Sequence, residues 1–215
     1  MNTPKALLTG VAAVLIWSLI GCRDFFTWLL EVFPVLAGVP VLILLYSRLR
    51  FTNLLYCLIA VHAGILMIGG HYTYAQMPVF EWIKQWFHLS RNYYDRVGHF
   101  AQGFVPAMIA REWLLRTTPL GPGKLMAALV MGVCMGISAL YELFEFAAAK
   151  LTGSAADAFL GSQGDPWDTQ WDMTFCLIGA TCALVFLSRL HNRAIAKVQS
   201  GDQDAAKQTG PVTSS

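Results

Sequence analysis

Long apolar stretches, separated by shorter polar segments, dominate the chain between residues 6 and 190. A transmembrane helix needs about 20 mostly apolar residues, and six stretches come close to that length. They predict membrane-spanning helices at residues 6–21, 26–46, 54–70, 98–115, 125–149 and 172–190. The pattern therefore predicts an all-α fold, a polytopic membrane bundle of about six transmembrane helices.

Lysine and arginine are distributed unevenly between the connecting segments. One side of the predicted bundle carries Lys5, Arg48, Arg50, Arg116, Lys124, Arg189, Arg193 and Lys197. The other side carries Arg23, Lys84, Arg91, Arg96 and Lys150. Because cytoplasmic loops are enriched in basic residues, the first side is expected to face the cytoplasm. Both termini are then cytoplasmic, as an even number of spans requires.

The apolar pattern ends near residue 197. Residues 1–197 are expected to form a single transmembrane domain. Residues 198–215 are rich in Gln, Ser, Gly and Asp and contain few large apolar side chains. That composition predicts a disordered cytoplasmic tail.

Two longer loops, residues 71–97 and 151–171, are expected on the outer side. In the first, Trp82, Trp86 and Phe87 recur at helical spacing after Pro78, which favours the first turn of a helix. The sequence predicts a short amphipathic helix lying in the membrane interface. A cap packed on the bundle is the alternative interpretation.

Composition supports a membrane protein. Of 215 residues, 56% are hydrophobic and only 13% are charged, whereas soluble domains are about a quarter charged. The five cysteines show no paired spacing, which argues against a disulfide framework or a cysteine metal site. No phosphate-binding loop or basic aromatic strip is present, so nucleic acid is not an expected partner. The expected partner is the lipid bilayer, and the sequence leaves the oligomeric state open.

Residues 19–22 (LIGC) admit a competing interpretation of the first apolar stretch. They are similar to the cleavage box of bacterial lipoproteins, which would leave a lipidated Cys22 outside the membrane. Such a short pattern also arises by chance in apolar sequence, and the uncleaved first span is the interpretation retained.

Acidic residues that are distant in sequence fall at one level of the predicted bundle, near its periplasmic face. They are Asp95, Glu142, Glu145, Asp157, Asp165, Asp168 and Asp172, joined by His99. Three pairs of these residues are three or four positions apart, so the two members of each pair share one face of a helix. The pairs are Asp95 with His99, Glu142 with Glu145, and Asp168 with Asp172. Since charges at membrane depth are costly and normally functional, the sequence predicts a convergent acidic pocket.

The pocket has three possible uses. A divalent metal ion is one, because carboxylates and one imidazole suit such ions; its candidate ligands are Asp95, His99, Glu142, Glu145 and Asp172. Acid–base catalysis is another, with Asp95, His99, Glu142 and Glu145 as catalytic groups. The third is binding of a lipid phosphate or another substrate group, with Arg96, His71 and Asp168 as substrate-binding residues.

A purely structural role is the strongest alternative to these uses. Arg91, Arg96 and Lys150 can pair with the acids and lock the helices together, with Arg96–Glu145 and Arg96–Asp172 as candidate pairs. A transporter is the further alternative.

Other polar or small residues are expected to serve packing. His62 is a candidate interhelical hydrogen-bond partner. Gly132 and Gly136 form a G-x-x-x-G pair that permits close helix approach. Arg111 and Glu112 lie about 18 Å from His99 by helical rise and are not expected to share its site.

Four motifs together resemble the YjdF family of bacterial inner-membrane proteins. They lie at residues 70–75 (GHYTYA), 92–104 (NYYDRVGHFAQGF), 141–145 (YELFE) and 156–173 (ADAFLGSQGDPWDTQWDM). The resemblance implies a multi-pass inner-membrane protein and supplies no catalytic residues. Residues 95–180 are also distantly similar to VanZ-like membrane proteins, which implies an envelope role. The combined expectation is a polar pocket acting, with or without a metal, on an envelope or lipid-headgroup substrate.

Overall fold

The computed structural model describes residues 3–153 and 157–208, and these residues form helices joined by short loops. The first half contains α1 (Thr3–Leu19), α2 (Phe25–Leu45), α3 (Asn53–Tyr72), the 3₁₀ turn η1 (Tyr74–Gln76) and α4 (Pro78–Trp86). The second half contains α5 (Tyr94–Thr117), α6 (Lys124–Thr152), α7 (Asp157–Leu160), α8 (Asp168–Cys182), the π-helical turn η3 (Ala183–Leu187) and α9 (Ser188–Gln208). The prediction of an all-α helix bundle is confirmed.

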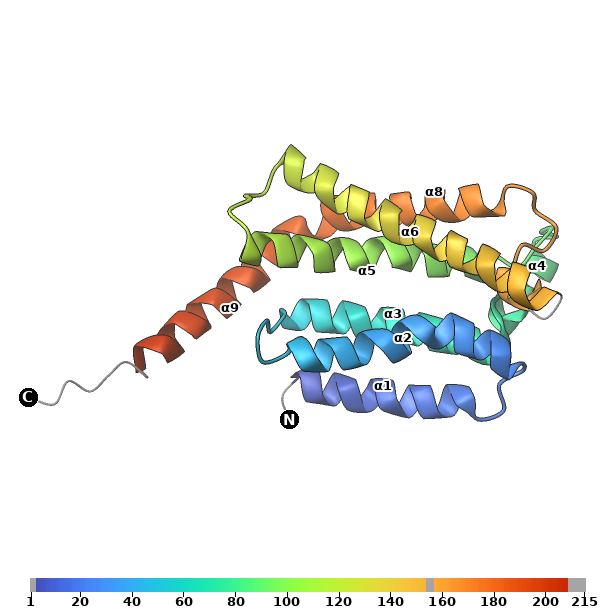
Figure 1. Cartoon of the computed structure of the whole chain (residues 1–215), viewed down its shortest axis with the longest axis horizontal. Helices are drawn as coiled ribbons and strands as arrows, with labels where there is room; N and C mark the ends of the chain where they lie inside the picture. Colours follow the sequence, from blue (N-terminus) through green and yellow to red (C-terminus); the bar gives the residue numbers. More distant parts are fainter. Residues whose placement is uncertain (1–2, 154–156, 209–215) are drawn as a thin grey trace, which may run out of the picture.

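Four helical segments are long and apolar enough to cross a membrane. They are Phe25–Leu45, Asn53–Tyr72, Lys124–Thr152 and the continuous run Asp168–Ser200. Helix α1 is apolar but has only 17 residues, and α5 is polar because it carries the candidate site and a second charged cluster. Both nevertheless run alongside the other helices in Figure 1. A multi-span bundle is confirmed, and the count of six spans stays a prediction.

The helices form two halves that lie against each other (Figure 1). One half contains α1, α2 and α3, and the other contains α5, α6 and α8, with α3 against α5 between them. Helix α4 and the loop before α8 lie at one end of the bundle, whereas α1 begins and α9 projects at the opposite end. The described chain therefore starts and finishes at the same end. Which side of the membrane that end faces stays a prediction.

Helix α9 continues into the segment for which the sequence predicts a disordered tail. It runs to Gln208, so residues 198–208 are helical. The physical reason is that Ala, Gln and Lys are good helix formers and extend a helix that is already nucleated. Residues 209–215 lie outside the described part of the chain, and the division into a transmembrane domain at 1–197 and a tail at 198–215 stays a prediction.

Helices α5 and α8 approach each other most closely at two glycines. A Cβ atom on Gly103 would overlap the carbonyl oxygen of Cys176, and one on Gly179 would overlap the carbonyl oxygen of Phe100. The predicted G-x-x-x-G contact at Gly132 and Gly136 is wrong within the described chain, because no atom lies within 4 Å of a Cβ placed at either position. These two glycines face outward on α6, since rotation of that helix turns other residues toward its neighbours.

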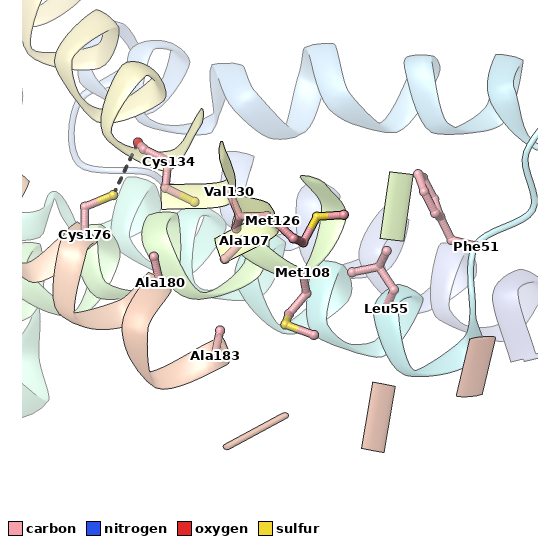
Figure 2. Close-up of a cluster of buried hydrophobic side chains, with 10 residues drawn as sticks. All are labelled: Phe51, Leu55, Ala107, Met108, Met126, Val130, Cys134, Cys176, Ala180 and Ala183. Carbon is pink, nitrogen blue, oxygen red and sulfur yellow. Dashed lines mark hydrogen bonds between the residues drawn. The ribbon is translucent and has the colours of Figure 1, made fainter. Parts of the chain in front are cut away.

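The close approach of α5 and α8 continues into a buried apolar cluster (Figure 2). Ten buried residues from the α2–α3 loop, α3, α5, α6, α8 and η3 form it: Phe51, Leu55, Ala107, Met108, Met126, Val130, Cys134, Cys176, Ala180 and Ala183. The Cys176 thiol donates a hydrogen bond to the carbonyl oxygen of Cys134, at 3.6 Å. This cluster joins the two halves and fixes the rotation of α5 and α8, whose first turns carry the candidate site.

Helix α4 forms where the sequence predicts a short amphipathic helix. Pro78 occupies its first turn, and none of its residues is buried. Trp82 and Trp86 are exposed, with ring centroids 5.5 Å apart. The amphipathic helix is confirmed, and the exposed tryptophans favour the interfacial position over a cap packed on the bundle.

Candidate functional site

Two arginines and three aspartates form a buried ion-pair cluster where α5 and α8 begin. Arg91 Nη1 lies 2.5 Å and Arg96 Nη2 lies 2.6 Å from the same oxygen, Oδ1 of Asp168. Arg96 also pairs with Asp172, and each arginine lies 3.4 Å from Asp165 Oδ2. We call these five residues the arginine cluster. Both guanidinium groups are 4% exposed, so several carboxylates are needed to offset their desolvation.

The arginine cluster confirms one sequence-based candidate pair. Arg96 pairs with Asp172 as expected, whereas no contact joins Arg96 to Glu145 among the described residues. Arg96 and Asp168 were candidate substrate-binding residues. Their charges are occupied by each other and by their neighbours, so neither is available in this conformation for an additional charged group.

His99 lies next to the arginine cluster, one turn further along α5. Its Nε2 atom is 3.3 Å from Asp95 Oδ1 and 3.4 Å from Asp172 Oδ1. On the other side of the ring, Nδ1 lies 3.1 Å from Gln102 Oε1 and 4.0 Å from Glu142 Oε1. We call these five residues the histidine centre. Because each ring nitrogen faces oxygen acceptors, either nitrogen can donate a hydrogen bond.

Asp172 belongs to both groups of residues. Its Oδ1 atom accepts from Arg96 and also faces His99 Nε2. Three possible ligand atoms, one each from Asp95, His99 and Asp172, lie within 4.8 Å of one another. Two carboxylate oxygens and one imidazole nitrogen are a suitable donor set for zinc or manganese. The position of Arg96 on Asp172 competes with such an ion.

A cavity of about 160 Å³ adjoins the histidine centre. Residues of α2, α3, η1, α5, α6 and α7 enclose it, so it lies at the junction of the two halves of the bundle. Its polar lining consists of Glu31, His62, Tyr74, Asp95, His99, Gln102, Tyr141 and Glu145. The remaining lining is apolar or glycine. We call this space the junction cavity.

Several polar atoms in and around the junction cavity lack hydrogen-bond partners. Within the described residues these atoms include Glu31 Oε2, His62 Nε2, Tyr74 Oη and Glu142 Oε1. Each such buried group costs free energy unless water or a ligand satisfies it. The arrangement therefore differs from the arginine cluster, where every acid faces a guanidinium.

The two predicted glutamates of α6 lie on the cavity side of the bundle. Glu142 faces His99, and Glu145 lines the junction cavity with 8% of its surface exposed. No hydrogen bond or ion pair of Glu145 occurs in the part of the chain that the structure describes. Asp95, His99, Glu142, Glu145 and Asp172 are thus brought to one end of three helices, as the sequence predicts.

His71 does not join these residues. Its ring stacks on Trp17 at 4.5 Å, and its Nδ1 atom lies 3.0 Å from the carbonyl oxygen of Ser18. It therefore joins the end of α3 to the end of α1. Asp157 falls in α7, but its side chain lies outside the described part. Lys150 lies over the Phe146 ring, at 5.7 Å from the ring centroid.

Glu31 is the site residue that the sequence interpretation missed. It is 2% exposed, and its Oε1 atom accepts a hydrogen bond from the Tyr74 amide at 3.3 Å. The signal was available, because Glu31 is the only charged residue in the long apolar helix Phe25–Leu45. Tyr74 lies in the predicted outer loop at residues 71–97, and nothing in its sequence context indicates a buried hydroxyl.

A second polar cluster lies elsewhere in the bundle, where α3, α5 and α9 meet. Glu112 is fully buried and accepts from the amide and hydroxyl of Thr52, each at 2.8 Å. Its Oε2 atom is also 2.8 Å from His191 Nε2, and Arg111 contacts both His191 and Asn192. As expected, Arg111 and Glu112 share no partner with His99. Their contacts are saturated, which indicates a structural role.

Comparison with known proteins places the chain in a family of predicted membrane proteins. The family described as "Predicted membrane protein (DUF2238)" matches residues 3–193. The Inner membrane protein YjdF of Escherichia coli (strain K12) is 48% identical over 195 residues, which cover 91% of this chain and 92% of that protein. No solved structure matches significantly. The weaker resemblance to VanZ-like proteins stays a prediction.

Proposed function

The chain belongs to the DUF2238 family of predicted membrane proteins, and we propose that this multi-pass inner-membrane protein carries out acid–base chemistry on the polar headgroup of an envelope lipid. The histidine centre would perform the chemistry, and the junction cavity would hold the substrate group. In this proposal the histidine centre has a chemical role and the adjacent arginine cluster has a structural role.

One observation carries the proposal. His99 contacts two carboxylates through Nε2, while the ring also borders a cavity that contains unpartnered polar atoms. A general acid or base must lie within hydrogen-bond reach of the proton that it transfers. His99 would meet that condition for a substrate group placed against its ring, and Asp95 and Asp172 would orient the ring.

Glu142 and Glu145 are the second pair of acid–base groups in this proposal. Glu142 Oε1 lies 4.0 Å from His99 Nδ1 and has no hydrogen-bond partner in the described chain. Glu145 lines the cavity one helical turn away. Together they offer a carboxyl group on the side of the imidazole opposite to Asp95, so a proton can be received and released at different atoms.

The arginine cluster serves as the scaffold. Arg91, just before α5, and Arg96, in its first turn, connect this region to the loop before α8 and to the start of α8 through Asp165, Asp168 and Asp172. Buried ion pairs of this kind hold elements in register even where they add little net stability. The purely structural role therefore fits the acids of the arginine cluster, and it does not extend to Glu142 and Glu145.

A divalent-metal centre is the second candidate function. The three convergent ligand atoms of Asp95, His99 and Asp172 favour it. Such an ion would activate water or polarise a substrate oxygen, and Glu142 and Glu145 would be additional ligands or bases. Binding would require Arg96 to move from Asp172 or to share that carboxylate.

The test compares lipid headgroup composition in cells that lack the protein and are complemented with variants. Wild type is expected to change the amount of at least one headgroup species, measured by mass spectrometry, and His99→Gln is expected to abolish that change. His71→Ala is the matched control, since this histidine lies at the same end of the bundle outside the cavity. A His99→Gln variant that folds and retains the change would overturn the proposal.

Elemental analysis of the purified protein tests the metal candidate. Close to one divalent ion per chain in wild type, and its loss in Asp172→Asn, would support it. A protein that changes lipid composition without a stoichiometric ion would exclude the metal centre and leave acid–base catalysis.

A further inference from the structure

Two residues that line the junction cavity each contain a buried oxygen atom without a hydrogen-bond partner in the described chain. Glu31 is 2% exposed and Tyr74 is 8% exposed, and both line the cavity. Their Oε2 and Oη atoms have no hydrogen-bond partner in the part of the chain that the structure describes. Because an unsatisfied buried polar atom is costly, the pair indicates a place where a ligand supplies the missing hydrogen bonds.

The charged residues that line the cavity indicate whether the ligand is a cation or an anion. Three carboxylates line it, those of Glu31, Asp95 and Glu145, and no Lys or Arg is among its lining residues. The Asp95 carboxylate pairs with Arg91, Arg96 and His99, whereas no ion pair of Glu31 or Glu145 occurs among the described residues. The nearest guanidinium groups, of Arg91 and Arg96, are already surrounded by aspartates. The cavity therefore favours a cation that donates hydrogen bonds.

The size and lining of the cavity favour an organic cation over a metal ion. Glu31 and Glu145 do not belong to the group of atoms close enough to hold one ion, which contains only Asp95, His99 and Asp172 among the described residues. Instead, the rings of Tyr74, Tyr141 and Phe159 line a space of about 160 Å³. Aromatic faces combined with carboxylates recognise ammonium groups.

The lining of the cavity is mostly polar at one end and mostly apolar at the other, where His62 is the polar exception. Its apolar lining includes Pro34, Leu66, Pro106 and Ile137. Pro106 lies about 10 Å deeper along α5 than His99, and Ile137 lies about 12 Å deeper along α6 than Glu145, by helical rise. An amphiphile with a cationic head and an apolar chain matches this gradient.

The apolar end reaches the outer surface of the bundle. Ile137 lines the cavity and is 39% exposed. Phe33 of α2 and Phe144 of α6 are both exposed, and their ring centroids are 6.0 Å apart. These aromatic side chains contact each other between α2 and α6 at the level of Glu145. The exposed Ile137, deeper along α6, therefore marks where an acyl chain would leave the cavity for the bilayer.

We propose that the junction cavity binds the protonated primary amine of a headgroup-sized ligand, with Glu31, Glu145 and Tyr74 as its recognition residues. The apolar half favours an aminophospholipid such as phosphatidylethanolamine over a free amine. This inference deepens the function proposed above and rests on it for the role of the bound headgroup. The binding itself is measurable without any turnover.

The experiment titrates protein purified in a mild detergent with short-chain phosphatidylethanolamine, with phosphatidylglycerol of the same chains, and with free ethanolamine. Phosphatidylethanolamine is expected to raise the unfolding temperature saturably, and phosphatidylglycerol to have no such effect. If free ethanolamine binds as tightly as the lipid, the amine site stands and its lipid source is overturned. If phosphatidylglycerol matches phosphatidylethanolamine, or neither binds, the inference is wrong.

Two variants test whether Glu31 and Tyr74 form the amine-binding site. Glu31→Gln is expected to weaken binding of phosphatidylethanolamine by about tenfold or more, the usual effect of losing a hydrogen bond to a charged group. Glu81→Gln, an acid on α4 outside the cavity, is the matched control. Tyr74→Phe removes only the unpartnered hydroxyl, so it is expected to fold as wild type and to bind more weakly. Wild-type binding by both cavity variants would overturn the assignment.

His99→Gln separates this inference from the proposed function. A variant that binds phosphatidylethanolamine but no longer changes lipid composition supports both. A wild-type protein that binds the lipid saturably, while cells show no change in any headgroup species, refutes the catalytic function and leaves the amine site standing.

Discussion

Arg96 of α5 and Asp172 of α8 form a buried ion pair between the two helices that carry the histidine centre. The same Asp172 oxygen faces His99 Nε2 at 3.4 Å. Asp95 makes the same connection, because it lies 3.5 Å from Arg91, 3.4 Å from Arg96 and 3.3 Å from His99. Two carboxylates thus connect the scaffold to the candidate acid–base group. Any change that frees Asp172 from Arg96 is expected to alter both the packing of α5 on α8 and the orientation of the imidazole.

Removing Arg96 tests the scaffold. Arg96→Gln removes the guanidinium partner of the buried Asp172 and leaves Arg91 as the partner of Asp168, so we expect the free energy of unfolding to fall by about 3 kcal/mol. Denaturant unfolding of the protein in detergent measures it. Lys84→Gln removes the exposed Lys84–Glu81 pair, and we expect a change below about 1 kcal/mol. Equal effects of the two changes would contradict a structural role for the arginine cluster.

The glycine contacts between α5 and α8 give a second prediction. Gly103→Ala places a Cβ on the Cys176 backbone, and we expect a loss of about 1–3 kcal/mol in unfolding free energy from overpacking. Gly136→Ala meets no atom within 4 Å and removes a flexible residue from a helix, so it is expected to be neutral or slightly stabilising. Thermal unfolding distinguishes them, and the reverse order would show that α6, not α8, makes the close contact.

The cluster around Glu112 gives a third prediction. Glu112→Ala leaves the Thr52 amide and the His191 ring without their acceptor, and we expect a loss of about 3 kcal/mol in stability. A double-mutant cycle with His191→Ala is expected to show coupling of about 0.5–3 kcal/mol. Additive effects would argue against a shared network. Binding of phosphatidylethanolamine is expected to persist wherever the variant folds.

Asp24 gives a prediction about pH. It caps α2 in the connection after α1, and the hydrogen bond from the Thr27 amide holds the pKa of the Asp24 carboxyl below its ordinary value. A lowered pKa in the folded state stabilises the protein above the ordinary pKa of the group, and this contribution disappears as the pH falls through the folded-state value. We therefore expect the Asp24 contribution to be constant near neutral pH and to decline below about pH 4.

Comparison of two Asp24 variants isolates this effect. Asn caps helices about as well as Asp but does not titrate, so Asp24→Asn is expected to remove only the acid-dependent part. Asp24→Ala is expected to lose about 1 kcal/mol at neutral pH through loss of the cap. Unfolding temperatures between pH 7 and pH 3 provide the measurement. An Asp24→Asn variant with the same acid sensitivity as wild type would assign that sensitivity to other groups.

Local sequence was sufficient to predict most helices. The apolar stretches gave α1, α2, α3 and α6 within a few residues, and Pro78 with its paired tryptophans gave α4. Local spacing also predicted that Asp95 and His99 would share a face of α5, since residues four apart on a helix always do. These predictions succeed because they depend on helix geometry and on the cost of placing polar groups in lipid.

Contacts between helices were predicted less well. The sequence offered Gly132 and Gly136 as the close-packing pair, whereas Gly103 and Gly179 make the contact. It included His71 in the site, although the ring stacks on Trp17, and it omitted Glu31. The glycine contact and the position of His71 depend on the rotation of a helix about its axis, which no single segment specifies. Glu31, by contrast, is marked in the sequence as the one charged residue of the apolar helix Phe25–Leu45.

The amino-acid sequence alone determined that this chain is a helical membrane protein with an excess of acids at one end, because apolar length and charge position are properties of each segment. Tertiary structure decided which acids neutralise arginine and which face a cavity. That division depends on how α5 and α8 pack, and on α2 bringing Glu31 across to Tyr74. Its physical basis is that a buried carboxylate is stabilised only by the partners that the other helices bring within reach.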